Sequence, residues 1–213
     1  FIYVAPSNST QKNLADYICN GTNDAQQINA AISAASAGTE IILLDGKFNI
    51  REKISVNKND LTIRGMGCST TLEQVELAGS TTALMFDITA DRLKLKDMML
   101  VDIDVNYPQY LISTYGDVYE CEFKRLVFIL KSTKTNSGAY INLNGTGLRF
   151  FNCRVFSNVD VPNKMTINVI GNSPILFGIL NTGAGNTKIN FSNTTYSVLA
   201  SNRTEIYVNN VKQ

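Results

Sequence analysis

Apolar and polar positions alternate with two different periods along the chain, and the period changes near residue 40. Within residues 24–37 the apolar side chains recur at intervals of three and four residues, which is the spacing of one helix face. These side chains are Ala25, Ile28, Ala31, Ile32 and Ala35. After residue 40, short apolar-alternating runs are separated by Asn, Gly, Asp, Ser and Thr, which is typical of strands and turns. The pattern therefore predicts one helix followed by an all-β body.

The residues that flank the expected helix predict its ends. Asp24, with Gln27 three residues later, is suited to cap the N-terminus, and Gly38 stands where a C-terminal glycine belongs. We expect an N-terminal extended strand and this helix over residues 1–39, and one continuous β domain over residues 40–213. Because the chain begins at Phe1 without a methionine, we expect it to be a fragment or a processed product of a longer protein.

An internal repeat runs through the β body. Apolar residues recur at offsets 0, 2, 5 and 7, and the distance between repeat starts falls from 32 residues (61 to 93) to 17 residues (189 to 206). The repeats start at Leu61, Leu93, Cys121, Leu148, Ile167, Ile189 and Ile206. Two copies fit less well, because the one at Ile167 is weaker and the one at Ile206 is cut short by the C-terminus.

The fifth residue of each repeat, at offset 4, breaks the two-residue period of a strand. Six of the seven residues at this position are Gly, Asn or Asp, which tolerate the left-handed backbone conformation. The seven are Gly65, Asp97, Arg125, Asn152, Gly171, Asn193 and Asn210. Each repeat is therefore predicted to form a strand, a one-residue kink and a second strand.

Stacked repeats of this length would form the coils of a parallel β-helix, with equivalent residues in columns about 4.8 Å apart. Offset 2 then predicts one interior column, made of Ile63, Leu95, Phe123, Phe150, Val169, Phe191 and Val208. The outward column of Lys94, Glu122 and Arg149 alternates in charge, which favours the same register. A β-sandwich would explain neither the kink nor the columns. We therefore expect the helix to cover the open first coil of a β-helix.

The opening of the chain resembles a known family. The stretches concerned are residues 15–22 (ADYICNGT), 28–32 (INAAI) and 41–49 (IILLDGKFN). They are similar to the N-terminal cap and first coil of the pectate-lyase-like right-handed parallel β-helix superfamily, of the kind found in bacteriophage tail-spike, tail-fibre and neck-appendage proteins. The match covers residues 14–65, although Asn20 stands where Asp is commoner in the family. The resemblance implies an all-β, single-stranded right-handed β-helix with a capping helix, and it implies a homotrimer.

Composition excludes several kinds of chemistry. The chain contains no histidine, which removes Ser-His-Asp and Cys-His catalysis, histidine metal sites and the histidine motif of the family's epimerase branch. The net charge of +1 gives no electrostatic footprint for nucleic acid or an anionic membrane, and no apolar run is long enough to span a bilayer. We expect no metal and no cofactor.

The four cysteines show no zinc-binding spacing. They are Cys19, Cys68, Cys121 and Cys153. Because Cys121 and Cys153 fall at interior offsets of the repeat, we expect free, buried thiols; two disulfides in a secreted protein are the alternative.

Two groups of residues are candidates for contact with a glycan. Asp102 and Asp104 are expected on one side of a strand, about 6–7 Å apart, near the carboxylate separation of inverting glycosidases. Their alternative role is a solvated strand face. Tyr107, Tyr110 and Tyr115 are candidates for a sugar-stacking patch, and the alternative is packing on the coil or on another subunit.

Three apolar residues, Val127, Ile129 and Phe151, are expected to face outward, where they would form a subunit interface.

Our first functional hypothesis is a structural and receptor-binding module of a phage tail or appendage that contacts host cell-surface polysaccharide. Its expected partners are other copies of the chain, other virion proteins and the glycan, and its expected location is the virion or the extracellular space. The second hypothesis is a polysaccharide lyase or glycoside hydrolase that uses acidic residues in the groove. The third is a non-viral bacterial surface β-helix. The residues show no convincing catalytic cluster, which favours the non-enzymatic hypotheses.

Overall fold

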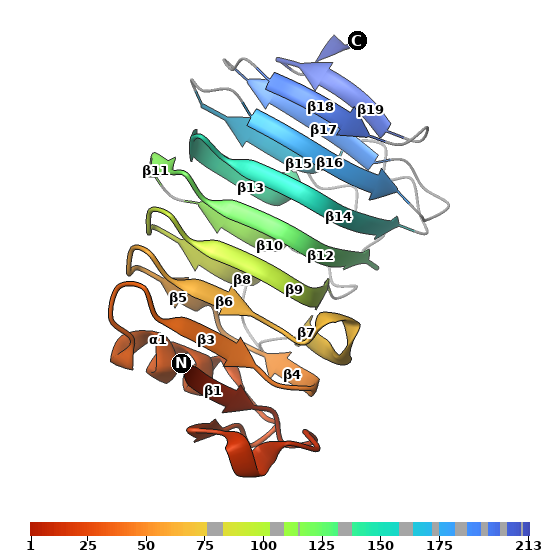
Figure 1. The fold of residues 1–213 in the computed structure, drawn as a ribbon. Helices are drawn as coiled ribbons and strands as arrows, with labels where there is room; N and C mark the ends of the chain where they lie inside the picture. The colour runs from red at the N-terminus through yellow and green to blue at the C-terminus, as the bar shows by residue number, and fades with distance from the viewer. Residues whose placement is uncertain are drawn as a thin grey trace.

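The computed structural model describes residues 1–75, 83–102, 109–114, 116–131, 138–157, 164–171, 175–181, 187–192, 196–200, 204–209 and 211–213. Over these residues the chain winds into a parallel β-helix whose coils stack from the N-terminus to the C-terminus (Figure 1). Each complete coil places one strand in a second sheet and the next strand in a first sheet. All described strand pairs are parallel except the pair formed by the last two strands.

The first sheet runs through the whole stack. In the order of their pairing its strands are β18 (Tyr196–Ala200), β16 (Ile175–Asn181), β14 (Arg149–Ser157), β12 (Glu122–Leu130), β9 (Lys94–Val101), β6 (Thr62–Arg64), β3 (Glu40–Leu43), β1 (Ile2–Ala5) and β2 (Tyr17–Ile18). Two further strands extend it sideways, with β4 (Gly46–Ile50) paired to β7 (Thr70–Gln74) and β7 paired to β9.

The second sheet lies behind the first in Figure 1. Its strands in pairing order are β20 (Val211–Lys212), β19 (Thr204–Val208), β17 (Thr187–Ser192), β15 (Lys164–Ile170), β13 (Gly138–Thr146), β10 (Gln109–Thr114), β8 (Ala83–Ile88) and β5 (Ile54–Val56), with β11 (Val118–Tyr119) beside β13. The described helical segments are α1 (Ala25–Ala34) and two short 3-10 helices, η1 (Lys12–Leu14) and η2 (Gly67–Ser69).

The interior column expected from the repeat is present in the first five coils. Ile41, Ile63, Leu95, Phe123 and Phe150 are in direct register across β3, β6, β9, β12 and β14, and all five side chains are fully buried. The rings of Phe123 and Phe150 stack with their centroids 4.7 Å apart. Offset stacking of this kind adds to the free energy gained by burying the rings.

Beyond Phe150 the expected column was wrong. Phe150 is in register with Phe177 of β16, whereas Val169 and Phe191 lie in the second sheet, where they continue a column that starts at Leu143. Val208 follows them in that second-sheet column. Strand alternation gives the inward face of a strand but not the sheet that the strand joins, so copies of the repeat that start at Ile167 and later were assigned to the wrong sheet.

The expected kink is present in three successive strands of the first sheet. Asp97, Arg125 and Asn152 have φ values of 60°, 50° and 52° inside β9, β12 and β14. Gly65 occupies the equivalent place for a different reason, since a Cβ there would lie 2.5 Å from the carbonyl oxygen of Asp97. The register shifts between β14 and β16, and the three-strand kink column ends there.

A second column of residues with left-handed backbone conformation precedes the first sheet and was not predicted from the repeat. Gly38, Asp60, Arg92, Glu120 and Gly147 stand three residues before the interior column in five successive coils, with φ values of 82°, 65°, 54°, 56° and 67°. Main-chain bonds between coils hold this turn, for example from Arg92 N to Tyr119 O at 2.7 Å. Gly38 therefore starts this column and does not end the helix, which stops at Ala34.

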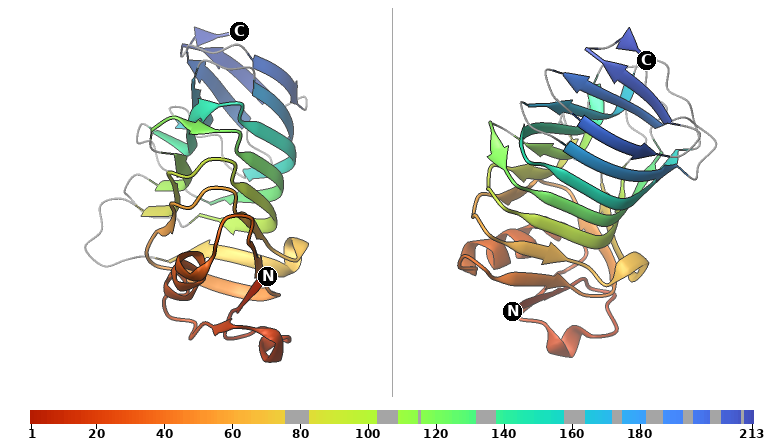
Figure 2. Two further views of the ribbon diagram at one scale, coloured as in Figure 1. Left: turned by 60° about the vertical axis from the view of Figure 1, so that its left-hand side comes forward. Right: turned by 45° about the horizontal axis from the view of Figure 1, so that its top comes forward.

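Helix α1 lies next to β5 at the N-terminal end of the second sheet, and the segment that contains η1 lies beyond it in both views of Figure 2. The apolar stripe expected from the sequence is buried along its whole length. Asn29 also pairs with the edge of β5, because its side-chain amide donates to Lys53 O (3.0 Å) and accepts from Ser55 N (2.9 Å). The helix thus satisfies main-chain groups that an open sheet edge would leave unpaired.

Asp24 lies at the N-cap position of α1, as expected, but its side chain makes no capping bond to the helix. Its carboxylate accepts from Gly21 N and from Asn49 N, both at 2.8 Å, and the residue is fully buried. Asp24 therefore joins the loop before the helix to β4.

Candidate functional site

Asp102 does not lie on the outer surface where the expected carboxylate pair would act. The residue is fully buried directly after β9, and its Oδ1 accepts the main-chain N–H of Lys131. Leu100, two residues earlier, is also fully buried, so Asp102 continues the inward side of the strand. Asp104 lies outside the described residues. The repeat itself contained this information, because its offset 7 is Leu100 and the next residue of the same parity is Asp102.

Of the three residues of the expected sugar-stacking patch, Tyr110 lies in the described part of the chain. Tyr110 is half-buried in β10, and its carbonyl oxygen accepts from the side-chain amide of Gln74 at 3.2 Å. Tyr110 also has the same parity as the fully buried Ile112. Tyr107 and Tyr115 lie outside the described residues.

The three expected interface residues face two different surfaces. Val127 and Ile129 are half-buried on the outer side of β12 after its kink. They are in register with other apolar residues of β9 and β14, namely Met99, Val101 and Phe156. Phe151 is also half-buried, but it precedes the kink at Asn152 and lies on the neighbouring surface.

That neighbouring surface carries most of the charge of the first sheet. We define the basic face as the outward residues that precede the kink, in β6, β9, β12 and β14. They are Thr62, Arg64, Lys94, Lys96, Glu122, Lys124, Arg149 and Phe151. With Glu40 of β3 at its edge, this surface holds five cationic and two anionic side chains, a net charge of +3. The whole chain has a net charge of only +1.

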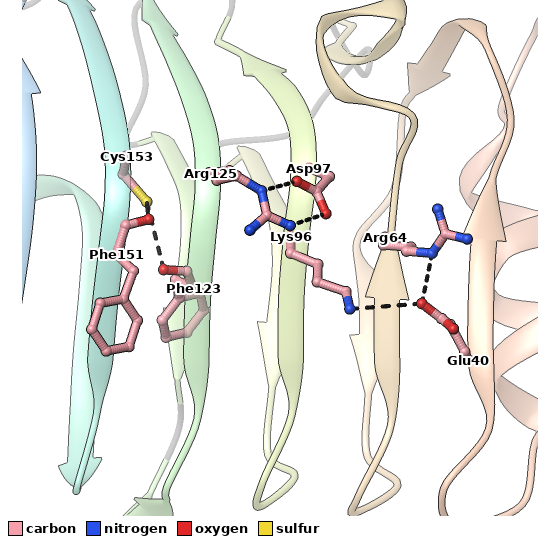
Figure 3. Close-up of polar contacts among 8 residues, drawn as sticks. All are labelled: Glu40, Arg64, Lys96, Asp97, Phe123, Arg125, Phe151 and Cys153. Carbon is pink, nitrogen blue, oxygen red and sulfur yellow. Dashed lines mark hydrogen bonds and ion pairs between the residues drawn. The ribbon is translucent and has the colours of Figure 1, made fainter.

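Two ion-pair groups order the N-terminal part of this surface (Figure 3). Glu40 Oε1 accepts from Arg64 Nε at 2.6 Å and lies 3.7 Å from Lys96 Nζ, so one carboxylate serves two coils. At the kink, Arg125 forms a bidentate pair with Asp97, in which Nη2 and Oδ2 are 2.7 Å apart. The guanidinium therefore links the kinks of β9 and β12.

The remaining cations of the basic face are not neutralised in this way. Lys94, Glu122 and Arg149 are in register, as expected from the sequence, but among the described residues they form no ion pair with one another. The neighbouring column, in which Lys124 stands directly opposite Lys96, was not predicted from the sequence. In the sequence, Lys96 and Lys124 stand two residues after Lys94 and Glu122, the position of the repeat at which the charges alternate.

Three of the four cysteines are free, buried thiols, as expected. Desolvation raises the pKa of Cys19 to about 12, of Cys121 to about 11 and of Cys153 to about 12. Cys68 is free but exposed within η2, which differs from the expectation of burial.

We expect one thiol to react in the native protein and four in denaturant. A thiolate is the reactive species, and at pH 8 the raised pKa and the burial of Cys19, Cys121 and Cys153 keep them neutral and covered. Titration with an aromatic disulfide reagent at pH 8 measures both numbers. A Cys68→Ser variant that still reacts rapidly in the native state would contradict the burial of the other three.

The described residues contain no group of three or more His, Cys, Asp or Glu side chains placed to hold a metal ion. In the same part of the chain, no helix has the length and apolar character needed to cross a membrane.

Solved structures share this architecture. A pectin methylesterase from Aspergillus niger superposes with a TM-score of 0.51 at 11% identity, over 97% of this chain and 83% of that one. A pectin methylesterase variant in complex with a hexasaccharide gives 0.43 at 13% identity, over 93% and 67% of the two chains. ORF18 of Geobacillus virus E2 gives 0.37 at 15% identity, over 88% and 58%. The first similarity shows the fold, while the other two scores are too low to support an argument.

The sequence matches no protein-family model and no curated protein. The fold itself is a right-handed parallel β-helix with an N-terminal helix, the fold that the opening of the chain indicated.

Proposed function

We propose that this chain is a glycan-binding β-helix module of a virion tail or appendage, and that it contacts host cell-surface polysaccharide. The observation that carries the proposal is the basic face, a polar surface that includes one aromatic ring. Its outward positions recur from coil to coil at the strand spacing of about 4.8 Å. A repeating surface suits a repeating polymer, because the same contacts recur along both.

Two further observations support this function. The opening of the chain resembles phage appendage proteins, and the fold is shared with a pectin methylesterase, an enzyme named for its action on a polysaccharide. The proposal includes a homotrimer in contact with other virion proteins. The apolar residues around Val127 and Ile129 supply a surface that a second copy of the chain would cover.

A second candidate function is a polysaccharide-degrading enzyme, a lyase or glycoside hydrolase. The fold shared with a pectin methylesterase favours it. The burial of Asp102 counts against the carboxylate pair that the sequence suggested for this chemistry.

Binding and cleavage are separable in one experiment. The purified chain is mixed with cell-wall and capsular polysaccharides from a panel of bacterial hosts, and retention of each glycan is measured together with the release of reducing ends and unsaturated uronates. We expect retention of at least one glycan without product release. Release of either product would favour the enzyme, and no retention across the panel would contradict the proposed function. Sedimentation of the same sample reports the oligomeric state, and a clean monomer would remove the trimer from the proposal.

A further inference from the structure

We infer that Lys94, Lys124, Arg149 and Phe151 form a subsite for an acidic sugar, so that the glycan bound at the basic face carries carboxylate or phosphate groups. This inference rests on the proposed glycan-binding function and specifies the chemistry of its ligand. The four residues lie on the outer side of three successive strands, β9, β12 and β14.

A column of like charges on the basic face is only partly compensated by ion pairs. Arg64, Lys96 and Lys124 occupy directly opposed positions of β6, β9 and β12. Like charges that face one another across neighbouring strands are destabilising. Glu40 relieves the first two, because it contacts both Arg64 and Lys96, but Lys124 forms no ion pair among the described residues. An anion from outside the chain would relieve it.

The cations that flank Lys124 are exposed to solvent. Lys94 and Arg149 are both exposed, and neither forms an ion pair within the described part of the chain. They lie two strands apart in one column, with Glu122 between them, so they span about 10 Å along the helix axis. Charges at this separation can contact successive acidic groups of one extended chain.

An aromatic ring lies beside these charges. Phe151 follows Lys124 in the same column and lies two residues after Arg149 on the same side of β14, about 6–7 Å along the strand. It is half-buried, so one part of the ring remains open to solvent. An aromatic ring next to cations fits a sugar that has an apolar ring surface and an anionic substituent. A polyanion without such a surface would not use the ring.

The test measures binding of three polymers at low and high salt, with duplex DNA as a control polyanion. They are polygalacturonate (carboxylate), poly(glycerol phosphate) teichoic acid (phosphate) and dextran (neutral). We expect the wild-type chain to bind at least one of the two acidic polymers, more weakly at high salt, and not to bind dextran. The acidic polymer that binds more tightly identifies whether carboxylate or phosphate is the preferred group.

Two variants and a matched control locate the site. Lys124→Gln and Phe151→Ala are each expected to weaken binding of the acidic polymer by about three- to tenfold, and only Lys124→Gln is expected to reduce the salt dependence. Lys47→Gln carries the same charge change on β4, outside the basic face, and is expected to bind as the wild type does. Circular dichroism and thermal unfolding show whether each variant is folded before its binding is compared.

Four outcomes would overturn the inference. They are binding of dextran alone, binding of neither acidic polymer, equal weakening by Lys47→Gln, and equally tight binding of duplex DNA, which would indicate unspecific attraction of polyanions. Binding of dextran alone would leave the proposed glycan-binding function intact. Absence of binding to every host polysaccharide would instead remove that function.

Discussion

Replacing Phe123 with alanine is expected to lower the free energy of unfolding by about 3–5 kcal/mol. The ring is fully buried in the middle of the interior column, between Leu95 and Phe150, and it stacks on the Phe150 ring. Its loss removes apolar contacts on both sides and leaves a cavity, because main-chain bonds hold the neighbouring coils at a fixed spacing and prevent them from closing the gap.

Urea denaturation followed by circular dichroism measures this loss. Tyr119→Ala removes an aromatic side chain of similar size that is 47% exposed, and it is expected to change the free energy of unfolding by less than about 0.5 kcal/mol. A loss below about 1 kcal/mol for Phe123→Ala would mean that the three side chains are not stacked neighbours, and the assignment of the coils would fall with it.

Replacing Asp24 with alanine is expected to cost about 2–4 kcal/mol, the second largest effect. Asp24 is fully buried and its carboxylate accepts main-chain N–H groups from Gly21 and Asn49, so its removal leaves two partly buried donors without this partner. Asp24→Asn is expected to cost less, because its amide oxygen can still accept one of the two bonds. Thermal unfolding of both variants measures the order of these effects.

One control separates this role from a general effect of charge. Asp117→Ala removes an exposed carboxylate and is expected to leave the stability within about 0.5 kcal/mol of the wild type. The Asp24 charge also contributes to the raised pKa of Cys19, so Asp24→Ala is expected to lower that pKa. An Asp24→Ala variant as stable as the wild type would show that the carboxylate does not hold the loop to β4.

The functional interpretation depends on which side of a strand each residue occupies. Asp102 illustrates this, because it stands two residues after the buried Leu100 and so lies inside the coil. Two acidic residues at strand spacing can act on a glycan in the groove only when both face that groove. Lys124 illustrates the reverse case. It is an ordinary lysine in the sequence, and only its position opposite Lys96 makes it a candidate for binding an anion.

The sequence by itself determined the local features of this protein. The helix stripe from Ala25 to Ala35 is buried as its spacing predicts, and the chain bends at Asp97 and Asn152 as their residue types predict. At Arg125 the position in the repeat, and not the residue type, predicts the kink. These features depend on periods of two to four residues and on backbone conformations that particular side chains tolerate, and both are properties of a short segment.

Only the tertiary structure decided which strands are neighbours. Phe150 pairs with Phe177 and not with Val169, the turn column contains Arg92 and Glu120, and the carboxylate of Asp24 bonds to Asn49 and not to the helix that follows it. Each of these contacts joins segments separated by a turn or a whole coil. Alternation has the same form in both sheets, and loop lengths differ from coil to coil, so the choice of partner is fixed by how the complete coils pack against each other.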